Sequence, residues 1–371
     1  MGGLFRREGT KMPGRISLLG RAVCAAVVCV SLVSAALAVD IETVSVGNPG
    51  NPGELSGEGA GGYGPDRICG AVDYEYNMGK YEVTAGQYAE FLNAVAWRAD
   101  AFALYNPSMA PYATEYSCGI EQSPQWYQLT PDIGGWGYKY TVAEDWANRP
   151  VNYVSWGDAA RFANWLHNGQ QSGLMGPLTT EHGSYALNGA MSDEDLMAVT
   201  RSPGATWAIP TEDEWYKAAY HKNDGVTGNY FDYPTTSNSV PSNDLVDPDP
   251  GNNATYFVTS PGIYTIGSPY YRTEVGTHEN SDSPYGTFDQ GGNMFEWNEA
   301  VPFESCRSLR GSSFSYGDTS MRASTRNNGI GPSIEQDDVG FRVSEVPEPC
   351  SIAILALGAV WTLRRRPNVR G

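Results

Sequence analysis

Apolar residues repeat at helical spacing in three stretches of the chain, and each stretch begins just after an N-capping residue. In the first, Thr84 precedes Gln87 by three positions, which is the spacing of a capping box. The apolar residues that follow recur at i, i+3, i+4 and i+7, on one helical face: Tyr88, Phe91, Leu92 and Val95. This pattern predicts an amphipathic helix that starts after Thr84.

The two other stretches carry the same signal. Ser155 with Asp158 begins a helix whose buried face is predicted to hold Phe162, Trp165 and Leu166. Thr211 with Glu214 begins a helix that buries Trp215, Ala218 and Ala219. Short strand-like segments, 78–83 and 207–210, lie ahead of the first and third helices. Pro210 ends the second of these segments just before the cap.

Regular periodicity is otherwise sparse. Residues 223–269 are mostly Gly, Pro, Asn, Ser, Thr and Tyr, which predicts a long loop region. Residues 39–66 contain a run of Gly, Pro, Asn and Glu, and we predict a disordered linker there. Residues 67–345 suit one domain. We therefore expect a coil-rich α+β domain that buries Tyr and Trp between loops.

Both ends have the composition of processing signals. Five basic residues precede an apolar run, 22–38, that closes on Ala36-Leu37-Ala38. This order predicts a signal peptide at 1–38, hence export; an N-terminal membrane anchor is the alternative, but the run is short for a span of about 20 residues. Residues 346–371 combine Val346-Pro347-Glu348-Pro349, a short apolar segment and an arginine cluster.

That second tail resembles the PEP-CTERM sorting signal. The resemblance implies recognition by an exosortase-type membrane protease, removal of the tail, and delivery to the outer surface or an extracellular matrix. Cys350 departs from it, because such tails usually carry Ser or Thr there. A tail that stays as a membrane anchor is the alternative.

The charge excludes some partners. The chain carries a net charge of −18, with 24 basic and 42 acidic residues. The two ends hold nine of the basic and two of the acidic residues, so residues 39–346 keep 15 basic and 40 acidic ones, a net charge of −25. Such a surface repels nucleic acid and anionic lipid. It suits a soluble exported protein that binds divalent cations.

Six blocks of sequence occur in an order that resembles the formylglycine-generating enzyme (sulfatase-modifying factor) family. They are MGKYEVTAGQYAEFLNAV (78–95), RPVNYVSWGDAARFANWL (149–166), WAIPTEDEWYKAAY (207–220), SPYGTFDQGGNMFEWNEA (283–300), LRGSSFSY (309–316) and DVGFRVSE (338–345). The resemblance covers nearly all of 72–345. It implies one asymmetric domain with little regular secondary structure, related to the C-type lectin-like fold.

The segment from Asp289 to Glu296 is the sharpest candidate for a cation site. Two carboxylates bracket a Gly-rich turn, and carboxylate and carbonyl oxygens are the ligands that calcium prefers. In the family the matching turn holds a structural calcium. Carried across, its ligands are the side chains of Asp289 and Glu296 and the carbonyls of Gly292 and Met294. The family's other calcium loop is not matched convincingly, although Asn253 stands at one ligand position.

This chain lacks the copper ligands on which the oxidase chemistry of the family depends. Active members bind Cu(I) through two closely spaced cysteines that follow the block here read as 310–314. This chain continues from Ser315 to Met321 without a cysteine, and none lies between Cys306 and Cys350. Hydroxyls do not replace thiolates as ligands for Cu(I), so we do not expect copper. Cys69, Cys118 and Cys306 remain in the core, and their disulfide pairing is open.

Other catalytic patterns are weak. The four histidines have no metal-ligand spacing, and the chain contains no Gly-x-Ser-x-Gly and no phosphate-binding loop. The family lines its substrate groove near the position of Arg322, Arg326 and Asn327, so these residues are ligand candidates. A charge-satisfying surface role is the alternative.

Two functions from different classes follow. The first is a non-catalytic, calcium-stabilised binding or matrix module that recognises an extracellular protein or glycan. The alternative is an oxidoreductase of the formylglycine-generating family that modifies a protein or small molecule through unrecognised residues. Bound redox metal discriminates between the two. A purely structural matrix component without a ligand is a third hypothesis.

Overall fold

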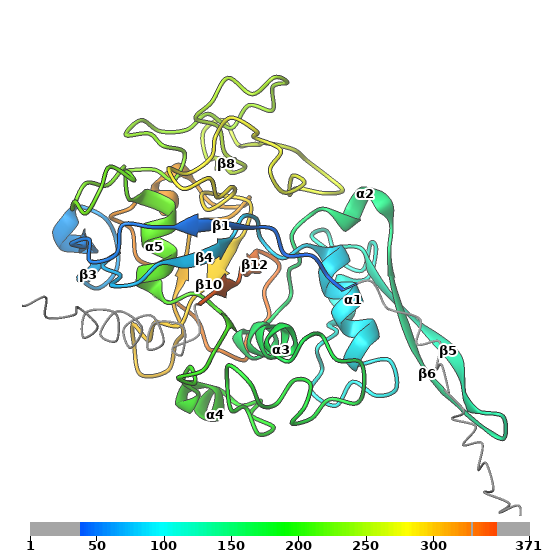
Figure 1. Cartoon of the computed structure of the whole chain (residues 1–371). Coiled ribbons are helices and arrows are strands. Elements are labelled where there is room, and N and C mark those ends of the chain that lie inside the picture. The colour runs from blue at the N-terminus through cyan, green and yellow to red at the C-terminus, as the bar shows by residue number, and fades with distance from the viewer. Residues whose placement is uncertain (1–37, 328, 347–371) are drawn as a thin grey trace, which may run out of the picture. The chain divides into compact units, whose positions relative to one another are not determined.

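The computed structural model describes residues 38–327 and 329–346. The predicted signal peptide and the predicted sorting tail therefore lie outside the described residues, apart from the positions next to the domain. No helix in the described part of the chain has both the length and the apolar character that a bilayer crossing requires. Short helices and short strands alternate with long irregular segments (Figure 1). This agrees with the expected coil-rich α+β class.

The central sheet joins segments from both ends of the domain. Its strand order is β1-β4-β13-β7, and every pair in it is antiparallel. The strands are β1 (Thr43–Val46), β4 (Tyr76–Gly79), β13 (Ser344–Glu345) and β7 (Trp207–Ala208). A second sheet has the order β11-β10-β12 and consists of β11 (Leu309–Arg310), β10 (Phe295–Trp297) and β12 (Val339–Gly340).

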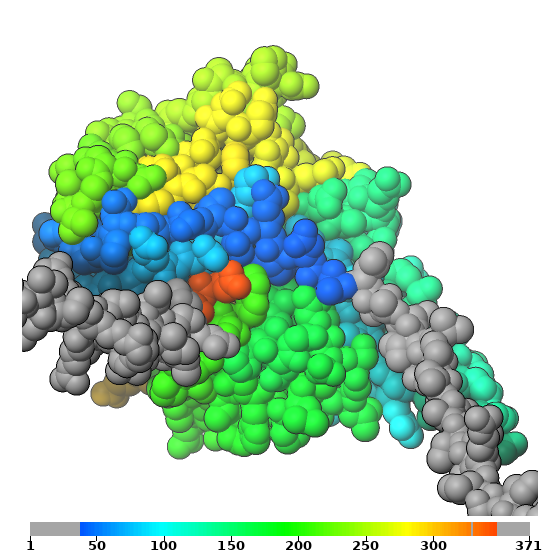
Figure 2. All heavy atoms as spheres, viewed as in Figure 1, coloured from blue at the N-terminus to red at the C-terminus, as the bar shows by residue number. Residues whose placement is uncertain are grey.

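Residues 39–66 are not a disordered linker, and this prediction was wrong. Strand β1 pairs with β4 through four residues, and β2 (Glu54–Ser56) pairs with β3 (Arg67–Cys69). Val46 and Ser56 are fully buried. In Figure 2 the N-terminal strands (blue) form a band between the loop region (yellow) and the helical region (green). The Gly- and Pro-rich composition comes from tight turns between short paired strands. In the sequence alone, this composition is the same as that of a disordered segment.

The three predicted N-caps are all present, and each forms a capping box, including the one at Ser155, for which the sequence predicted only the cap. They begin helices α1 (Ala85–Val95), α3 (Trp156–His167) and α5 (Glu212–Tyr220). In each case the hydroxyl of the capping residue accepts from the backbone N–H three positions on, and the side chain at that position accepts from the backbone N–H of the cap. The remaining helices are α2 (Glu144–Ala147), α4 (Asp193–Ala198), η1 (Glu58–Ala60), η2 (Pro107–Met109) and η3 (Asp318–Met321).

Aromatic side chains fill the space between α1, α3 and the chain ahead of β13. Phe162 of α3 packs edge-to-face on Phe91 at 5.3 Å between ring centroids and on Phe341 at 5.4 Å. Tyr88 and Trp165 complete the cluster. Full burial of such a ring stabilises a fold by about 1.5–3 kcal/mol. The helical faces predicted from periodicity are thus the faces that meet in the core.

Buried arginines satisfy backbone carbonyls where ladder hydrogen bonds are lacking. Arg272 donates to the carbonyls of Tyr116 and Ser117, and Arg307 donates to those of Leu196, Val199 and Glu299. A buried carbonyl without a partner costs free energy. In these loops, charged side chains therefore supply the hydrogen bonds to buried carbonyls that neighbouring strands supply in a regular sheet.

Two further hairpins complete the structure. A long one consists of β5 (Ile120–Thr130) and β6 (Ile133–Val142), and it extends away from α1 (Figure 1). A short one, β8 (Phe257–Val258) and β9 (Ile263–Tyr264), lies within the predicted loop region 223–269.

Candidate functional site

The predicted cation turn precedes β10 and has an unusual backbone. Asp289, Gly292 and Asn293 have φ angles of 60°, 85° and 56°, in the left-handed region. Asp and Asn tolerate this region better than other residues with a side chain. At Gly292 a Cβ atom would lie 2.2 Å from the carbonyl oxygen of Thr255, so only glycine fits. The turn thus depends on the residue types that the sequence places there.

Glu296 lies in β10 with its carboxylate already paired. Arg342 donates from Nε to Oε2 at 2.6 Å and from Nη2 to Oε1 at 2.7 Å. The indole Nε1 of Trp215 also donates to Oε2, at 2.7 Å. All three side chains are fully buried. A structural ion pair therefore compensates the charge of this predicted calcium ligand.

Asp289 lies at the other end of the turn and is partly buried. Its Oδ2 accepts the backbone N–H of Gly276 at 2.7 Å. Desolvation raises the pKa of Asp289 above its ordinary value, although this N–H and the nearby His278 and Arg342 oppose the rise. The carboxylate has no salt bridge of its own among the described residues. Asp289 is thus the predicted ligand whose charge is least compensated.

Sequence reasoning missed a third carboxylate at this turn. Glu82 is 1% exposed and accepts from the backbone N–H of Met294 at 3.0 Å and from Nδ2 of Asn293 at 2.8 Å. Burial, together with the negative charges of Asp289 and Glu296, raises its pKa well above the ordinary value. Glu82 lies in the strand-like segment 78–83, far away in sequence, and no local pattern connects it to the turn.

The fit of the turn to a hard cation is partial. Oδ1 of Asn293 is buried and has no hydrogen-bond partner among the residues that the structure describes. A small enclosed cavity of about 10 Å³, lined by Asn253, His278 and Asp289 among others, lies next to the turn; this is about the room that one water molecule needs. However, no group of three or more His, Cys, Asp or Glu side chains in residues 38–327 and 329–346 is arranged to hold a metal ion. Amide and backbone oxygens would have to supply the remaining ligands.

The three groove candidates do not form one set. Arg326 is 4% exposed and binds Glu212 through Nε at 2.7 Å and Nη2 at 2.9 Å. Arg322 is partly exposed and donates to the hydroxyl of Tyr233 at 2.8 Å. Asn327 accepts the N–H of Gly329 through its side-chain oxygen. Of the three, only Arg322 presents a charged group to solvent.

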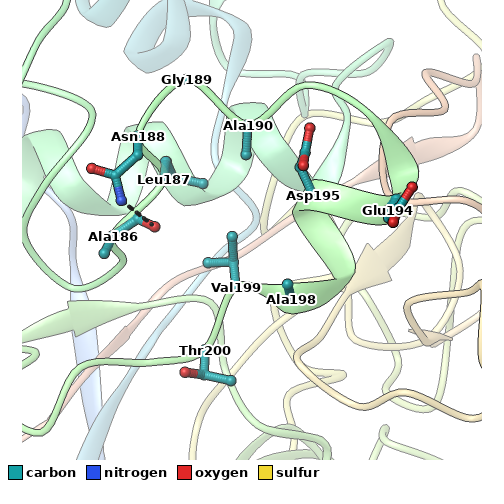
Figure 3. A pocket seen from close by; sticks show the side chains of 10 residues that line it. All are labelled: Ala186, Leu187, Asn188, Gly189, Ala190, Glu194, Asp195, Ala198, Val199 and Thr200. Carbon is teal, nitrogen blue, oxygen red and sulfur yellow. Dashed lines mark hydrogen bonds between the residues drawn. The ribbon is translucent and has the colours of Figure 1, made fainter.

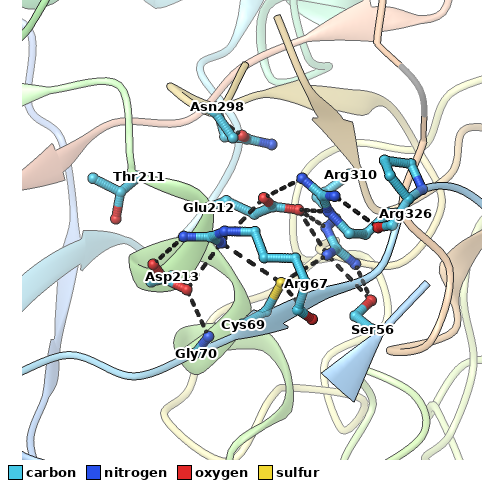
Figure 4. A network of polar contacts seen from close by, with 12 residues as sticks. Ser56, Arg67, Cys69, Gly70, Thr211, Glu212, Asp213, Asn298, Arg310 and Arg326 are labelled. Carbon is cyan, nitrogen blue, oxygen red and sulfur yellow. Dashed lines mark hydrogen bonds and ion pairs between the residues drawn. The ribbon is translucent and has the colours of Figure 1, made fainter. Parts of the chain in front are cut away.

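Glu212, the first residue of α5, is the centre of a buried polar network (Figure 4). Its carboxylate forms ion pairs with Arg67 at 3.1 Å and with Arg310 and Arg326 at 2.7 Å. Burial alone would raise the pKa of Glu212, but the three guanidinium groups outweigh it and lower the pKa to about 2. Nη2 of Arg310 also lies 3.3 Å from the thiol of Cys69.

The three cysteines within residues 38–327 and 329–346 form no disulfide. Cys69, Cys118 and Cys306 are all free thiols, so none of the open disulfide pairings is formed. Cys69 and Cys118 are fully buried, and burial raises the pKa of both thiols. Because the thiolate is the reactive form, these two cysteines are expected to be inert.

Serine hydroxyls lie at the end of the block 310–314, after which the resembled family places its copper thiolates: Ser313 is within this block and Ser315 follows it. The hydroxyls of Ser313 and Ser315 lie 3.1 Å apart and donate to Oδ2 of Asp338 at 3.2 and 3.5 Å. Burial, with a further contribution from the charge of Asp337, raises the pKa of Asp338 to about 6. Two hydroxyls and a carboxylate are hard ligands, and they do not select Cu(I).

The pKa of Asp338 predicts how stability depends on pH. Because the pKa is higher in the folded chain than the reference value of 3.8, the folded state binds this proton more tightly, and stability falls as pH rises from about 4 to about 6. We expect Asp338→Asn to raise the free energy of unfolding by about 1–3 kcal/mol at about pH 8 and to have little effect near pH 4. Urea unfolding across this range measures the difference, and identical pH profiles would contradict the assignment.

An open hollow of about 540 Å³ lies between the 186–190 turn and α4 (Figure 3). Small and apolar side chains line most of it, with Asn188, Glu194, Asp195 and Thr200 as the polar ones. None of the predicted site residues lines it. Its residues contain no nucleophile with an adjacent base, so it offers no catalytic constellation.

Comparison with solved structures finds chains of similar fold. Treponema denticola variable protein 1 is similar in structure, with 19% sequence identity and a TM-score of 0.50 over 82% of this chain and 95% of that protein. CarF (17% identity, TM-score 0.44, covering 83% of this chain and 99% of that protein) and PvdO from Pseudomonas aeruginosa (16%, 0.41, 76% and 85%) match more distantly. At these identities the likeness concerns the fold alone. No curated protein matches the sequence.

The family comparison covers most of the chain. The model of the sulfatase-modifying factor enzyme 1-like domain matches residues 70–346. This range contains all six sequence blocks, the three capped helices and the turn before β10. The chain therefore belongs to the family of sulfatase-modifying factor enzyme 1-like domains.

Proposed function

We propose that this chain is an exported surface or matrix protein whose sulfatase-modifying-factor-like domain is a non-catalytic, calcium-stabilised binding module. One observation carries the proposal: the hydroxyls of Ser313 and Ser315, which come after β11, lie against the carboxylate of Asp338, which precedes β12, and no cysteine lies between Cys306 and Cys350. A copper oxidase needs soft thiolates, and these groups are hard oxygen donors. The domain keeps the fold of its family without the ligands for that oxidation.

The proposed calcium supports the turn before β10. Burial and then the negative charges of Asp289 and Glu296 raise the pKa of Glu82, and burial and then the charge of Glu296 raise the pKa of Asp289, while Arg342 is the main positive charge opposite these carboxylates. The excess negative charge and the unpartnered Oδ1 of Asn293 favour a cation. Asp289 and the carbonyls of Gly292 and Met294 would hold the ion. Glu296 would contribute mainly by the electrostatic attraction of its negative charge. The bound cation would fix the turn and carry out no chemistry.

Export and surface display belong to the same proposal. The predicted signal peptide at 1–38 and the tail at 346–371, with an exosortase-type protease as its partner, would place the acidic domain outside the cell. A domain related to the C-type lectin-like fold would there bind an extracellular protein or glycan. The net charge of −25 of residues 39–346 supports solubility in that setting and disfavours nucleic acid.

Elemental analysis and chelation test this proposal. We expect the chain, purified with calcium, copper and iron available, to hold calcium near one equivalent and neither redox metal. If the concentration of free calcium is about a hundred times the dissociation constant of the site, removing the calcium with a chelator should lower the free energy of unfolding by about 2.7 kcal/mol. Asp289→Ala should abolish this chelator effect, whereas Asp289→Asn keeps an oxygen and should retain part of it.

Asp132→Asn provides the matched control, because Asp132 is an exposed acidic residue remote from the turn. It should leave the chelator effect unchanged. An equal response to chelator in Asp289→Ala and in the unmodified chain would remove the calcium site from the proposal. Stoichiometric copper or iron would instead favour the oxidoreductase alternative.

A further inference from the structure

The β5–β6 hairpin carries exposed aromatic side chains on one face. Trp126 lies opposite Trp136, and Pro124 lies opposite Tyr138 in the register. Directly opposed residues point to the same side of a two-stranded ribbon. The exposed fractions are 48% for Trp126, 70% for Trp136 and 37% for Tyr138. We call this side, with Gln122, Gln128, Gly134 and Tyr140 as its other positions, the tryptophan face.

The local sequence is built to present these rings. The two indoles pack edge-to-face with centroids 5.5 Å apart and planes at 77°. A Cβ atom at Gly134 would lie 2.5 Å from Cζ2 of Trp126, so the indole lies along the ribbon only because this residue is glycine. The rings therefore have a defined arrangement, although most of the Trp136 side chain meets solvent.

The opposite face and the base of the hairpin are anchored without these rings. Tyr127 on the opposite face packs on Trp97 at 4.7 Å between ring centroids. Tyr138 donates its backbone N–H to the carbonyl of Trp97 at 2.6 Å. Asn93 of α1 exchanges two hydrogen bonds with the backbone of Tyr140, at 2.8 and 2.9 Å. These contacts attach the hairpin to the domain, and the exposed tryptophans take no part in them.

The edges of the hairpin are poorly suited to pairing with a second copy of the chain. The N–H groups of Tyr138 and Tyr140 point away from β5, toward Trp97 and Asn93. Pro124, opposite Tyr138, therefore faces outward on the other edge, where it has no N–H to donate. Proline at such a position blocks strand addition.

The size and charge of the tryptophan face select its partner. Four positions on each strand at about 6.6 Å spacing give a face roughly 20 Å long and, across two strands, about 10 Å wide. Its area, on the order of 200 Å², is far below the about 800 Å² per partner of a stable protein interface. Its eight positions include no charged residue, while the domain as a whole is strongly acidic. A charged polymer or a second acidic copy finds no complementary group there.

We propose that the tryptophan face binds a neutral polysaccharide. The faces of aromatic rings carry partial negative charge, and the axial C–H groups of a sugar ring carry partial positive charge, so the two attract one another over an apolar contact. The hydroxyl of Tyr138 is an uncharged hydrogen-bonding group beside the rings, as sugar hydroxyls require. Gln122, nearer the base of the hairpin, adds an uncharged amide whose nitrogen also donates to the hydroxyl of Tyr140 at 3.0 Å. This inference rests on the proposed binding-module function and names its ligand class.

Affinity electrophoresis of the full chain through gels that contain dextran, soluble β-glucan or xylan tests the proposal, with anionic alginate as the charged comparison. We expect retardation by at least one neutral polymer and none by alginate. Trp136→Ala should weaken binding by about tenfold or more, as loss of a central aromatic contact does. Trp136→Tyr should retain most of it.

Two further variants separate a binding role from a structural one. Gly134→Ala keeps both tryptophans but displaces the Trp126 ring, and it should also reduce retardation. Phe303→Ala removes an aromatic side chain that is 46% exposed outside the hairpin and should have no effect. Unchanged thermal unfolding of Trp136→Ala, expected for so exposed a residue, shows that lost binding is not lost folding.

No retardation by any neutral polymer, or equal retardation of Trp136→Ala and the unmodified chain, would overturn the proposal. So would tryptophan-dependent dimerisation, or tryptophan-dependent binding to phosphatidylcholine vesicles. The metal analysis above does not depend on the tryptophan face. If the chain holds calcium but does not bind a neutral polysaccharide, the proposed ligand class is refuted and the proposal of a calcium-stabilised module still stands.

Discussion

Glu212→Gln should lower the free energy of unfolding by about 3–5 kcal/mol, the range for breaking a buried ion pair from one side. The carboxylate is fully buried among Arg67, Arg310 and Arg326, and the guanidinium groups of Arg310 and Arg326 are buried with it. A neutral amide of the same shape leaves their charges without compensation in a medium that solvates them poorly. Urea unfolding at neutral pH measures the loss.

Acid pH should reproduce part of this effect in the unmodified chain. The pKa of Glu212 is about 2 in the folded chain, below its reference value of 4.5. The stabilisation is therefore present above about pH 4.5 and is lost as the pH falls towards 2, by roughly 3 kcal/mol in total. Glu212→Gln should lack this part of the acid dependence.

Asp213→Asn is the matched control for Glu212→Gln. Asp213 follows Glu212 and also pairs with Arg67, at 2.5 Å, but the two side chains are 25% and 36% exposed. Solvent-accessible ion pairs contribute about 0–1 kcal/mol. If Asp213→Asn were as destabilising as Glu212→Gln, the buried network would not be the source of the effect.

Arg342→Met should be about as destabilising, by about 3–5 kcal/mol. Arg342 is fully buried and donates to both carboxylate oxygens of Glu296 and to the carbonyls of Gly79 and Phe288. Methionine fills similar volume but leaves a buried carboxylate and two carbonyls without their donor. Since Gly79 ends β4 and Glu296 lies in β10, the variant should loosen the contact between the two sheets.

Arg322→Met provides the comparison for this second variant. Arg322 is 42% exposed and lies 3.6 Å from Asp318, so we expect a loss of at most about 1 kcal/mol. A double variant with Glu296→Leu should recover stability, because it removes the uncompensated carboxylate as well. Absence of any recovery would mean that the backbone contacts of Arg342 dominate its role.

The sequence by itself determined the elements whose signals are local. Thr84, Ser155 and Thr211 each bond with a residue three positions on, so a capping box is complete within one turn of chain. The apolar faces that follow these caps meet in the core as their periodicity predicts. The lack of a cysteine between Cys306 and Cys350 is likewise a property of sequence that no folding can change.

The tertiary structure alone decided how the polar residues are used. The ion pairs of Glu212 join positions 98 to 145 residues apart, and Glu82 contacts Asn293 across 211 residues. No periodic pattern encodes such partners, because each depends on where irregular loops end. The β5–β6 ribbon exposes residues on both faces and so lacks the alternation that marks a half-buried strand. Residues 39–66 looked disordered because the strands that they pair with come later in the chain.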